Sequence, residues 1–205
     1  MQPLIKKVLA LFTTAKESPS KPVPFGHKTA WVAVRSNDAN AVAAALSLSS
    51  RREAGWQAGV IAAYEYPAKE VFVTPPMGGW VCVIGLWLSE SIDITEKNLA
   101  ELSTVFGEAH AYANHRVVGL AQWILAKDGK IVRCYSYLGE SGEVTNDTGE
   151  PTAVELKLRP TVDSAEDWYP DEDDVMAVAS ARSFDPSKLS ADSGPPALGV
   201  LGIAG

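Results

Sequence analysis

The sequence predicts an α+β fold, a mostly antiparallel sheet with about three helices packed on it. Two apolar-rich runs flank Asp128-Gly129, the strongest short-range hairpin signal, because a type I′ turn needs positive φ at both central residues. Short β-branched and aromatic runs recur along the chain between turn residues. Three longer segments repeat apolar residues at helical spacing.

The hairpin extends from Gly119 to Gly142 and sets the expected register of two strands. Its turn predicts the following pairs: Lys127 with Lys130, Leu125 with Val132, and Trp123 with Cys134. Trp123, Leu125, Val132 and Cys134 then share the core face. The other face is expected to be half exposed and carries Gln122, Arg133, Tyr135 and Tyr137.

Four other segments are expected to be strands or strand-like: 29–35, 70–74, 80–88 and, as a short strand or a loop, 110–114. The run at 80–88 is apolar at nearly every position, which indicates a central strand covered on both faces.

Helices are expected at 38–48, 95–106 and 171–183. Asn37 or Asp38 caps the first, and Gly107 ends the second. The third begins after Pro170 with a run of acids that complements the helix dipole. Segment 152–158 is predicted to form one or two helical turns, segment 139–151 to be a polar loop, and segment 49–69 remains open between helix and strand.

The predicted organisation has three parts: an amphipathic segment with a Pro/Ser linker (1–28), a single α+β domain (29–189) and a flexible Gly-rich tail (190–205). Lys6 and Lys7 precede a short apolar run, as in a signal peptide, but no clear cleavage site follows. We therefore expect a cytoplasmic protein, or an exported one if residues 1–15 are a cleaved signal. No run reaches the roughly 20 apolar residues of a membrane span.

Charge is distributed unevenly along the chain. Residues 1–60 hold eight Lys or Arg and three Asp or Glu, a balance of +5, whereas residues 140–192 hold four and fourteen, a balance of −10. This asymmetry argues against nucleic-acid binding over the whole surface. It is compatible with a basic partner, or with solubility alone.

Motifs for catalysis, metals or cofactors do not stand out. Cys82 and Cys134 lie in apolar runs typical of buried thiols, and could pair only if their strands were neighbours. The histidines lack metal-ligand spacing. No nucleophile elbow and no Gly-rich loop before a helix is present. The prediction is no catalytic residue, no metal and no cofactor.

The acids form the main candidate site. One group lies at 139–151 and the other at the start of the third helix: Glu140, Glu143, Asp147 and Glu150, then Asp171, Glu172, Asp173 and Asp174. Three interpretations remain open: solvated acids with a helix cap, a recognition surface for a basic partner, or a glycosidase-like acid pair. Arg133 and Tyr135 are further candidates, because Arg and Tyr are enriched at interface hot spots, although a loop or helix could cover them.

The segments VFVTPPMGGWVCVIG (71–85) and FGEAHAYANHRVVGLAQWILAKDGKIVRCYSYLGESGEV (106–144) carry a resemblance. They are similar to a family of small bacterial proteins of unassigned biochemistry, and the likeness spans about residues 29–185, including Glu150-Pro151 and Asp185-Pro186. The resemblance implies an immunity protein of a bacterial toxin system. It carries over no catalytic residue.

The expected function is therefore a non-enzymatic binding protein, an immunity protein that neutralises a secreted antibacterial toxin by occluding it. Its partner would be the cognate toxin or effector, basic at the contact, because an acidic surface steers such a partner into place. The alternative is a hydrolase that uses a carboxylate pair in a cleft of the sheet.

Overall fold

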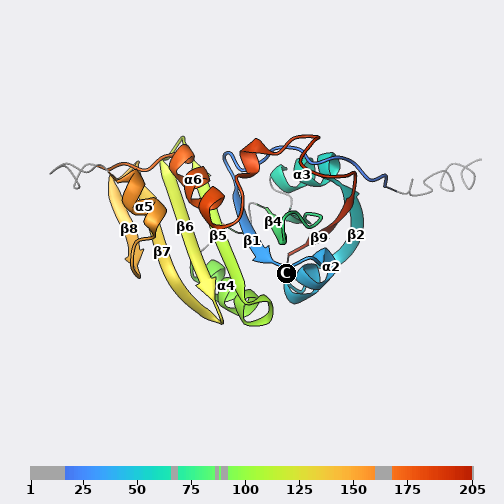
Figure 1. Cartoon of the computed structure of the whole chain (residues 1–205), viewed down its shortest axis with the longest axis horizontal. Coiled ribbons are helices and arrows are strands. Elements are labelled where there is room, and N and C mark those ends of the chain that lie inside the picture. The colour runs from blue at the N-terminus through green and yellow to red at the C-terminus, as the bar shows by residue number, and fades with distance from the viewer. Residues whose placement is uncertain (1–16, 66–68, 86–87, 89–91, 160–167, 205) are drawn as a thin grey trace, which may run out of the picture.

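The computed structural model describes residues 17–65, 69–85, 88, 92–159 and 168–204 (Figure 1). Its nine strands are β1 (Ala30–Arg35), β2 (Ser49–Gly55), β3 (Glu70–Val73), β4 (Trp80–Ile84), β5 (Glu108–His115), β6 (Leu120–Lys127), β7 (Lys130–Leu138), β8 (Glu143–Thr148) and β9 (Leu198–Ile203). They form one sheet in the order β2-β9-β3-β4-β1-β5-β6-β7-β8. Every ladder is antiparallel, which confirms the α+β class with a mostly antiparallel sheet.

More helices cover this sheet than the sequence predicted. The described residues contain five α-helices, α2 (Ala39–Ala45), α3 (Trp56–Tyr64), α4 (Ile92–Phe106), α5 (Ala153–Leu158) and α6 (Glu172–Arg182), and the 3-10 helix η3 (Pro186–Lys188). The helices predicted at 38–48, 95–106 and 171–183 are α2, α4 and α6 with shifted ends. The helical turns predicted at 152–158 correspond to α5. Helix α3 lies in segment 49–69, for which the sequence did not decide between helix and strand. No helix among the described residues combines the length and apolar character needed to cross a bilayer.

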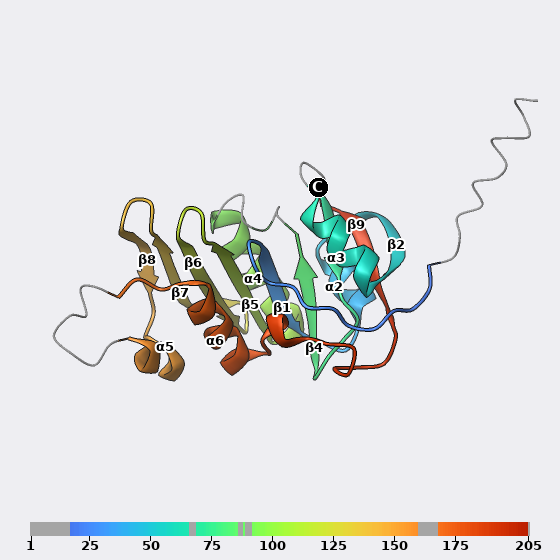
Figure 2. The same ribbon diagram turned by 90° about the horizontal axis from the view of Figure 1, so that it is seen from above.

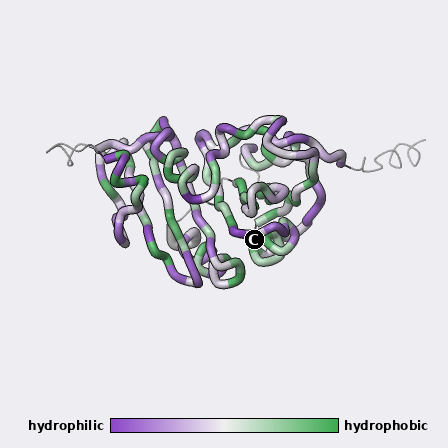
Figure 3. The backbone as a smooth tube through the Cα atoms, in the orientation of Figure 1, coloured by the Kyte–Doolittle hydropathy of each residue, from purple (hydrophilic) through white to green (hydrophobic). Residues whose placement is uncertain are grey.

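Helices lie on both faces of the sheet (Figure 2), and each face has its own hydrophobic core. On one face α2 and α4 cover small aliphatic side chains such as Val32 and Val83. On the other face α3 and α6 cover the large aromatic ones, among them Trp31 and Trp123. Successive strand residues alternate between these cores, so β4 is buried at all five positions, as its apolar run predicted. Figure 3 shows that hydrophobic and hydrophilic residues are interspersed along the strands.

The turn at Asp128-Gly129 is confirmed, but the predicted register beyond it is wrong. Both residues have positive φ, 48° and 81°. Lys127 pairs with Lys130 and Ala126 with Ile131, and then an irregularity leaves Val132 without a partner, so that Leu125 pairs with Arg133. Because Val132 is an extra residue in β7, each side chain that follows it lies on the face of the sheet opposite to the predicted one. Arg133, Tyr135 and Tyr137 therefore join Trp123 and are buried, whereas Cys134 faces the opposite core.

The segment predicted as a polar loop, 139–151, contains strand β8. All of its residues except Asn146 are exposed, so no apolar alternation marks it in the sequence. Its ladder with β7 satisfies the backbone groups that face β7, and β8 forms one edge of the sheet.

The prediction that residues 190–205 form a flexible tail is wrong for the second half of this segment. Residues 198–203 form β9, which lies between β2 and β3 and joins β2 to the rest of the sheet. The predicted linker also packs on the domain, since Ser20 bridges to Ala197 and Phe25 is buried. The amphipathic segment or cleaved signal expected within residues 1–15 lies outside the described residues.

A substitution at Gly199 tests the position of β9 in the sheet directly. A Cβ added there would lie 2.3 Å from the carbonyl oxygen of Val73 and 2.7 Å from the ring of Phe72. We expect Gly199→Ala to lower the free energy of unfolding by about 1–3 kcal/mol, as overpacking does, measured by urea denaturation. Gly194→Ala is the control, because its nearest neighbour would be 3.6 Å away. Equal stability of the two variants would contradict the position of β9.

Candidate functional site

Arg133 is the centre of a buried ionic cluster that joins β7, β8 and α5. Its side chain is 1% exposed and that of Glu155 is 0% exposed. Nε and Nη2 donate to the same Glu155 oxygen at 2.9 and 2.6 Å, and Nη1 donates to Asp147. Nη1 also lies 3.1 Å from the carbonyl oxygens of both Thr148 and Gly149. The guanidinium therefore fixes the end of β8 through its backbone and its side chain together.

Glu155 holds the other side of this cluster through a capping box at the start of α5. Its second oxygen accepts from the backbone of Thr152 at 2.8 Å, while the Thr152 hydroxyl accepts from the backbone of Glu155. Burial alone would raise the pKa of Glu155, but the hydrogen bonds from Arg133 and Thr152 outweigh burial and lower it. Glu155 did not stand out as a site residue in the sequence, although Thr-x-x-Glu before an apolar residue is the capping-box pattern that marks it.

An aromatic cluster lies next to the ion pairs. Tyr135 stacks on Trp123 with ring centroids 4.7 Å apart, and Trp168 lies 5.5 Å from Tyr135. The guanidinium of Arg159 lies 5.8 Å from the Tyr135 ring and 5.3 Å from the Trp168 ring. Tyr135 is only 2% exposed. Arg133 and Tyr135, predicted as possible partner contacts, are therefore inside the protein, where they support the acidic segments.

The structure separates the acids of 139–151 into two groups. Glu140 and Glu143 lie at the turn between β7 and β8 and are exposed. Asp147 and Glu150 lie at the far end of β8. Asp147 is 44% exposed and is engaged by Arg133 and, at 3.7 Å, by Arg159. Glu150 is exposed.

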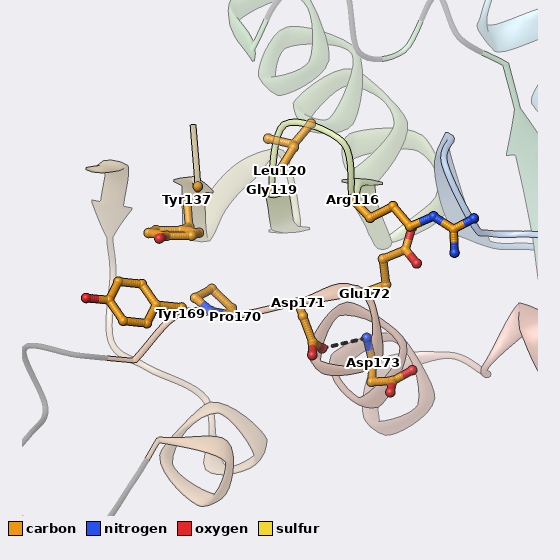
Figure 4. Close-up of a pocket in the computed structure, with 10 residues that line it drawn as sticks. Arg116, Gly119, Leu120, Tyr137, Tyr169, Pro170, Asp171, Glu172 and Asp173 are labelled. Carbon is orange, nitrogen blue, oxygen red and sulfur yellow. Dashed lines mark hydrogen bonds between the residues drawn. The ribbon is translucent and has the colours of Figure 1, made fainter. Parts of the chain in front are cut away.

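Acids at the start of α6 line a hollow of about 420 Å³, and Gly139, the neighbour of Glu140 in the sequence, also lines it (Figure 4). Gly139 and Tyr137 line it from the sheet, and Tyr169, Asp171 and Asp173 from the start of α6. The rings of Tyr137 and Tyr169 are 5.9 Å apart, and Tyr169 is 60% exposed. The hollow was not predicted, because it depends on segments that are far apart in the sequence.

Two of the four α6 acids cap their own helix. Asp171 accepts from the backbone of Asp173 at 2.8 Å and of Asp174 at 3.2 Å, and Asp174 accepts from the backbone of Asp171. Burial is the main cause that raises the pKa of Asp174. Glu172 lies 3.7 Å from His27 and points toward Arg116, whereas Asp173 points away from the hollow (Figure 4). Asp173 is exposed, and its carboxylate does not cap the helix.

His110, Cys82 and Cys134 are buried inside the protein. His110 is 2% exposed and lies 3.1 Å from Glu108, and burial is the main cause that lowers its pKa to about 4. Cys82 and Cys134 are both buried free thiols on strands that are not neighbours, so they do not pair. Burial raises the pKa of both thiols, that of Cys134 to about 12. Among the described residues, no group of three or more His, Cys, Asp or Glu is placed to hold a metal ion.

No family model, no curated protein and no solved structure matches the chain.

The Arg133 cluster predicts a large effect of one substitution. Arg133→Met leaves Glu155 buried without its counter-ion, so we expect a loss of about 3–5 kcal/mol in the free energy of unfolding, measured in urea. The double variant Arg133→Met/Glu155→Leu should recover most of that loss, because it removes the stranded charge. Arg116→Met is the control, since Arg116 is exposed and forms no ion pair with a described residue. A loss under about 1 kcal/mol for Arg133→Met would contradict a buried ion pair.

The same cluster predicts how stability depends on pH. The pKa of Glu155 is lower in the folded chain than its ordinary value of 4.5. The ionised Glu155 carboxylate therefore makes its full contribution to the free energy of unfolding above pH 4.5. That contribution is lost as the pH falls through the pKa of Glu155 in the folded protein. In urea titrations from pH 6 downward, Glu155→Gln should be less stable at pH 6 and should lose less stability on acidification than the parent protein. Parallel pH profiles for the two proteins would be the contrary result.

Proposed function

We propose that the protein is a non-enzymatic immunity protein, which binds and occludes a secreted antibacterial toxin that is basic at the contact. The observation that carries this proposal is a set of exposed carboxylates, three beside β8 and one on α6, that form no ion pair with a described residue. They are Glu140, Glu143, Glu150 and Asp173. Carboxylates left without internal partners are available for an external cation.

The surroundings of these acids favour protein binding. The nearby hollow adds Tyr169, a residue type common at hot spots, and Tyr137. The supporting elements are ordered by the buried cluster of Arg133, so a partner meets a preformed surface. The negative field of this end raises the rate at which a basic partner arrives.

The choice of a toxin as partner depends on the resemblance of residues 71–85 and 106–144 to the bacterial family described above. The cytoplasm, as the compartment of this proposal, agrees with two buried cysteines that remain free.

A hydrolase remains a weaker candidate. A catalytic acid pair needs two carboxyl groups that converge on one substrate bond. Around the hollow Asp171 caps its helix, Glu172 points toward Arg116 and Asp173 points away (Figure 4). The acids among the described residues that line the hollow therefore point in different directions. Such an arrangement suits attraction of a basic partner better than catalysis by a carboxylate pair.

The proposal predicts that the product of the adjacent gene binds this protein. We expect the two to co-purify after co-expression, and the triple variant Glu140→Gln/Glu143→Gln/Asp173→Asn to lower the association rate constant by about tenfold at low salt. Surface plasmon resonance at several salt concentrations measures this rate.

The matched control removes the same charge elsewhere. Glu53, Glu65 and Glu101 are exposed acids on other elements. Changing all three to Gln should leave the association rate within about twofold of the parent rate, since charges beyond the Debye length are largely screened. An adjacent gene product that neither co-purifies nor binds at micromolar concentration defeats the proposal. So does an equal effect of the two triple variants.

A further inference from the structure

Strand β8 ends the sheet with an open edge. It pairs with β7 on one side, and no described strand pairs with it on the other. A sheet edge presents backbone donors and acceptors that can pair with another extended chain. Its side chains offer little obstruction, since none is larger than Glu and the apolar one, Val144, is 51% exposed.

The opposite edge, β2, is less suited to such pairing. Both edge ladders contain an irregularity, that of β8 at Thr145 and that of β2 between Ser49 and Arg52, but only in β2 does a residue there have a positive φ, Ser50 at 50°. Arg52 of β2 also forms an ion pair with Glu70 of β3 at 2.7 Å. A backbone that leaves the extended conformation interrupts pairing with a further strand, and this protects the β2 edge.

The β8 edge is held rigidly from behind. Nη1 of the buried Arg133 bonds the carbonyl oxygens of Thr148 and Gly149 and the carboxylate of Asp147. A further bond joins the Thr145 hydroxyl to the carbonyl oxygen of Ser136 on β7. An edge that is already ordered loses little conformational entropy when another strand pairs with it.

We propose that β8 binds an extended basic segment of the partner protein, which pairs with it as an additional strand. This inference rests on the proposed function and names the way in which the partner is recognised. Main-chain hydrogen bonds along β8 supply affinity, and the acids supply selectivity for lysine- and arginine-rich segments. Among the acids without an internal ion pair, Glu140 and Glu143 lie at one end of the edge and Glu150 at the other, whereas Asp147 is already paired with Arg133.

The same acids disfavour a second copy of this chain through β8. Two β8 strands side by side would bring like charges together, and such pairs are destabilising. A basic strand of another protein meets no such repulsion. The β8 edge therefore rejects its own copies and accepts a partner of opposite charge.

Hydrogen exchange with a designed peptide tests the pairing. The probe is a peptide that alternates lysine and valine, and its controls are the same peptide N-methylated at alternate residues and a glutamate–valine peptide. We expect the lysine–valine peptide to slow exchange of amides 143–148 by about tenfold or more, and to leave β2 amides unchanged. The N-methylated peptide keeps its charge but cannot pair along its backbone, so it should bind about tenfold more weakly.

A charge variant with a matched control completes the design. Glu143→Lys should weaken binding of the lysine–valine peptide about tenfold, whereas Glu53→Lys on β2 should change it less than twofold. Equal binding of the parent and N-methylated peptides would overturn strand pairing. Slowed exchange of β8 amides in the protein alone, together with dimers in sedimentation, would identify a second copy as the occupant and also overturn the inference.

The outcomes separate this inference from the proposed function. If the adjacent gene product binds and the β8 amides exchange as before, the edge inference fails and the immunity function stands. If the peptide slows the β8 amides and the gene product does not bind, the immunity function fails and the basic-strand site stands.

Discussion

The buried guanidinium of Arg133 is the constraint on which the acidic end of the molecule depends. One side chain bonds Glu155 on α5, Asp147 on β8 and the backbone that follows β8. Buried charges are costly unless every donor has an acceptor, and here the cluster satisfies that demand by joining three elements. β8 has almost no apolar surface of its own, so this cluster and the β7 ladder hold it in place.

The acids of this end have two distinct roles. Asp147, Asp171, Asp174 and Glu155 are bonded to Arg133 or to helix backbone, and they organise the structure. Glu140, Glu143 and Glu150 are exposed beside the edge strand, and Asp173 is exposed on α6. Glu140, Glu143 and Glu150 together give a negative field beside β8. A basic segment in extended conformation can pair with the acids through its charges and with the open edge of β8 through its main-chain hydrogen bonds.

Local chemistry made part of this structure predictable from the sequence. The Asp128-Gly129 turn, the helix starts at Asp38 and Asp171 and the buried β4 each follow from a few neighbouring residues. The register of β7 was not predictable, because one extra residue at Val132 exchanges its faces without altering the apolar pattern. β8 was missed because its exposed, mostly polar residues show no apolar alternation. β9 was missed because pairing with β2 and β3, which are distant in the sequence, and close packing at Gly199 determine it. The site followed the same division. Its acids were visible in the sequence, whereas the burial of Arg133 and Tyr135 required the tertiary structure.

Carboxylate footprinting of the complex with the adjacent gene product tests the central claim most directly. Carbodiimide coupling to an amine, followed by mass spectrometry, reports which carboxylates become protected on binding. Protection should fall on Glu140, Glu143, Glu150 and Asp173, and Glu53, Glu65 and Glu101 should remain as reactive as in the free protein. Protection confined to the second group, or a complex in which the first group stays fully reactive, would contradict the assignment of the β8 end as the binding surface.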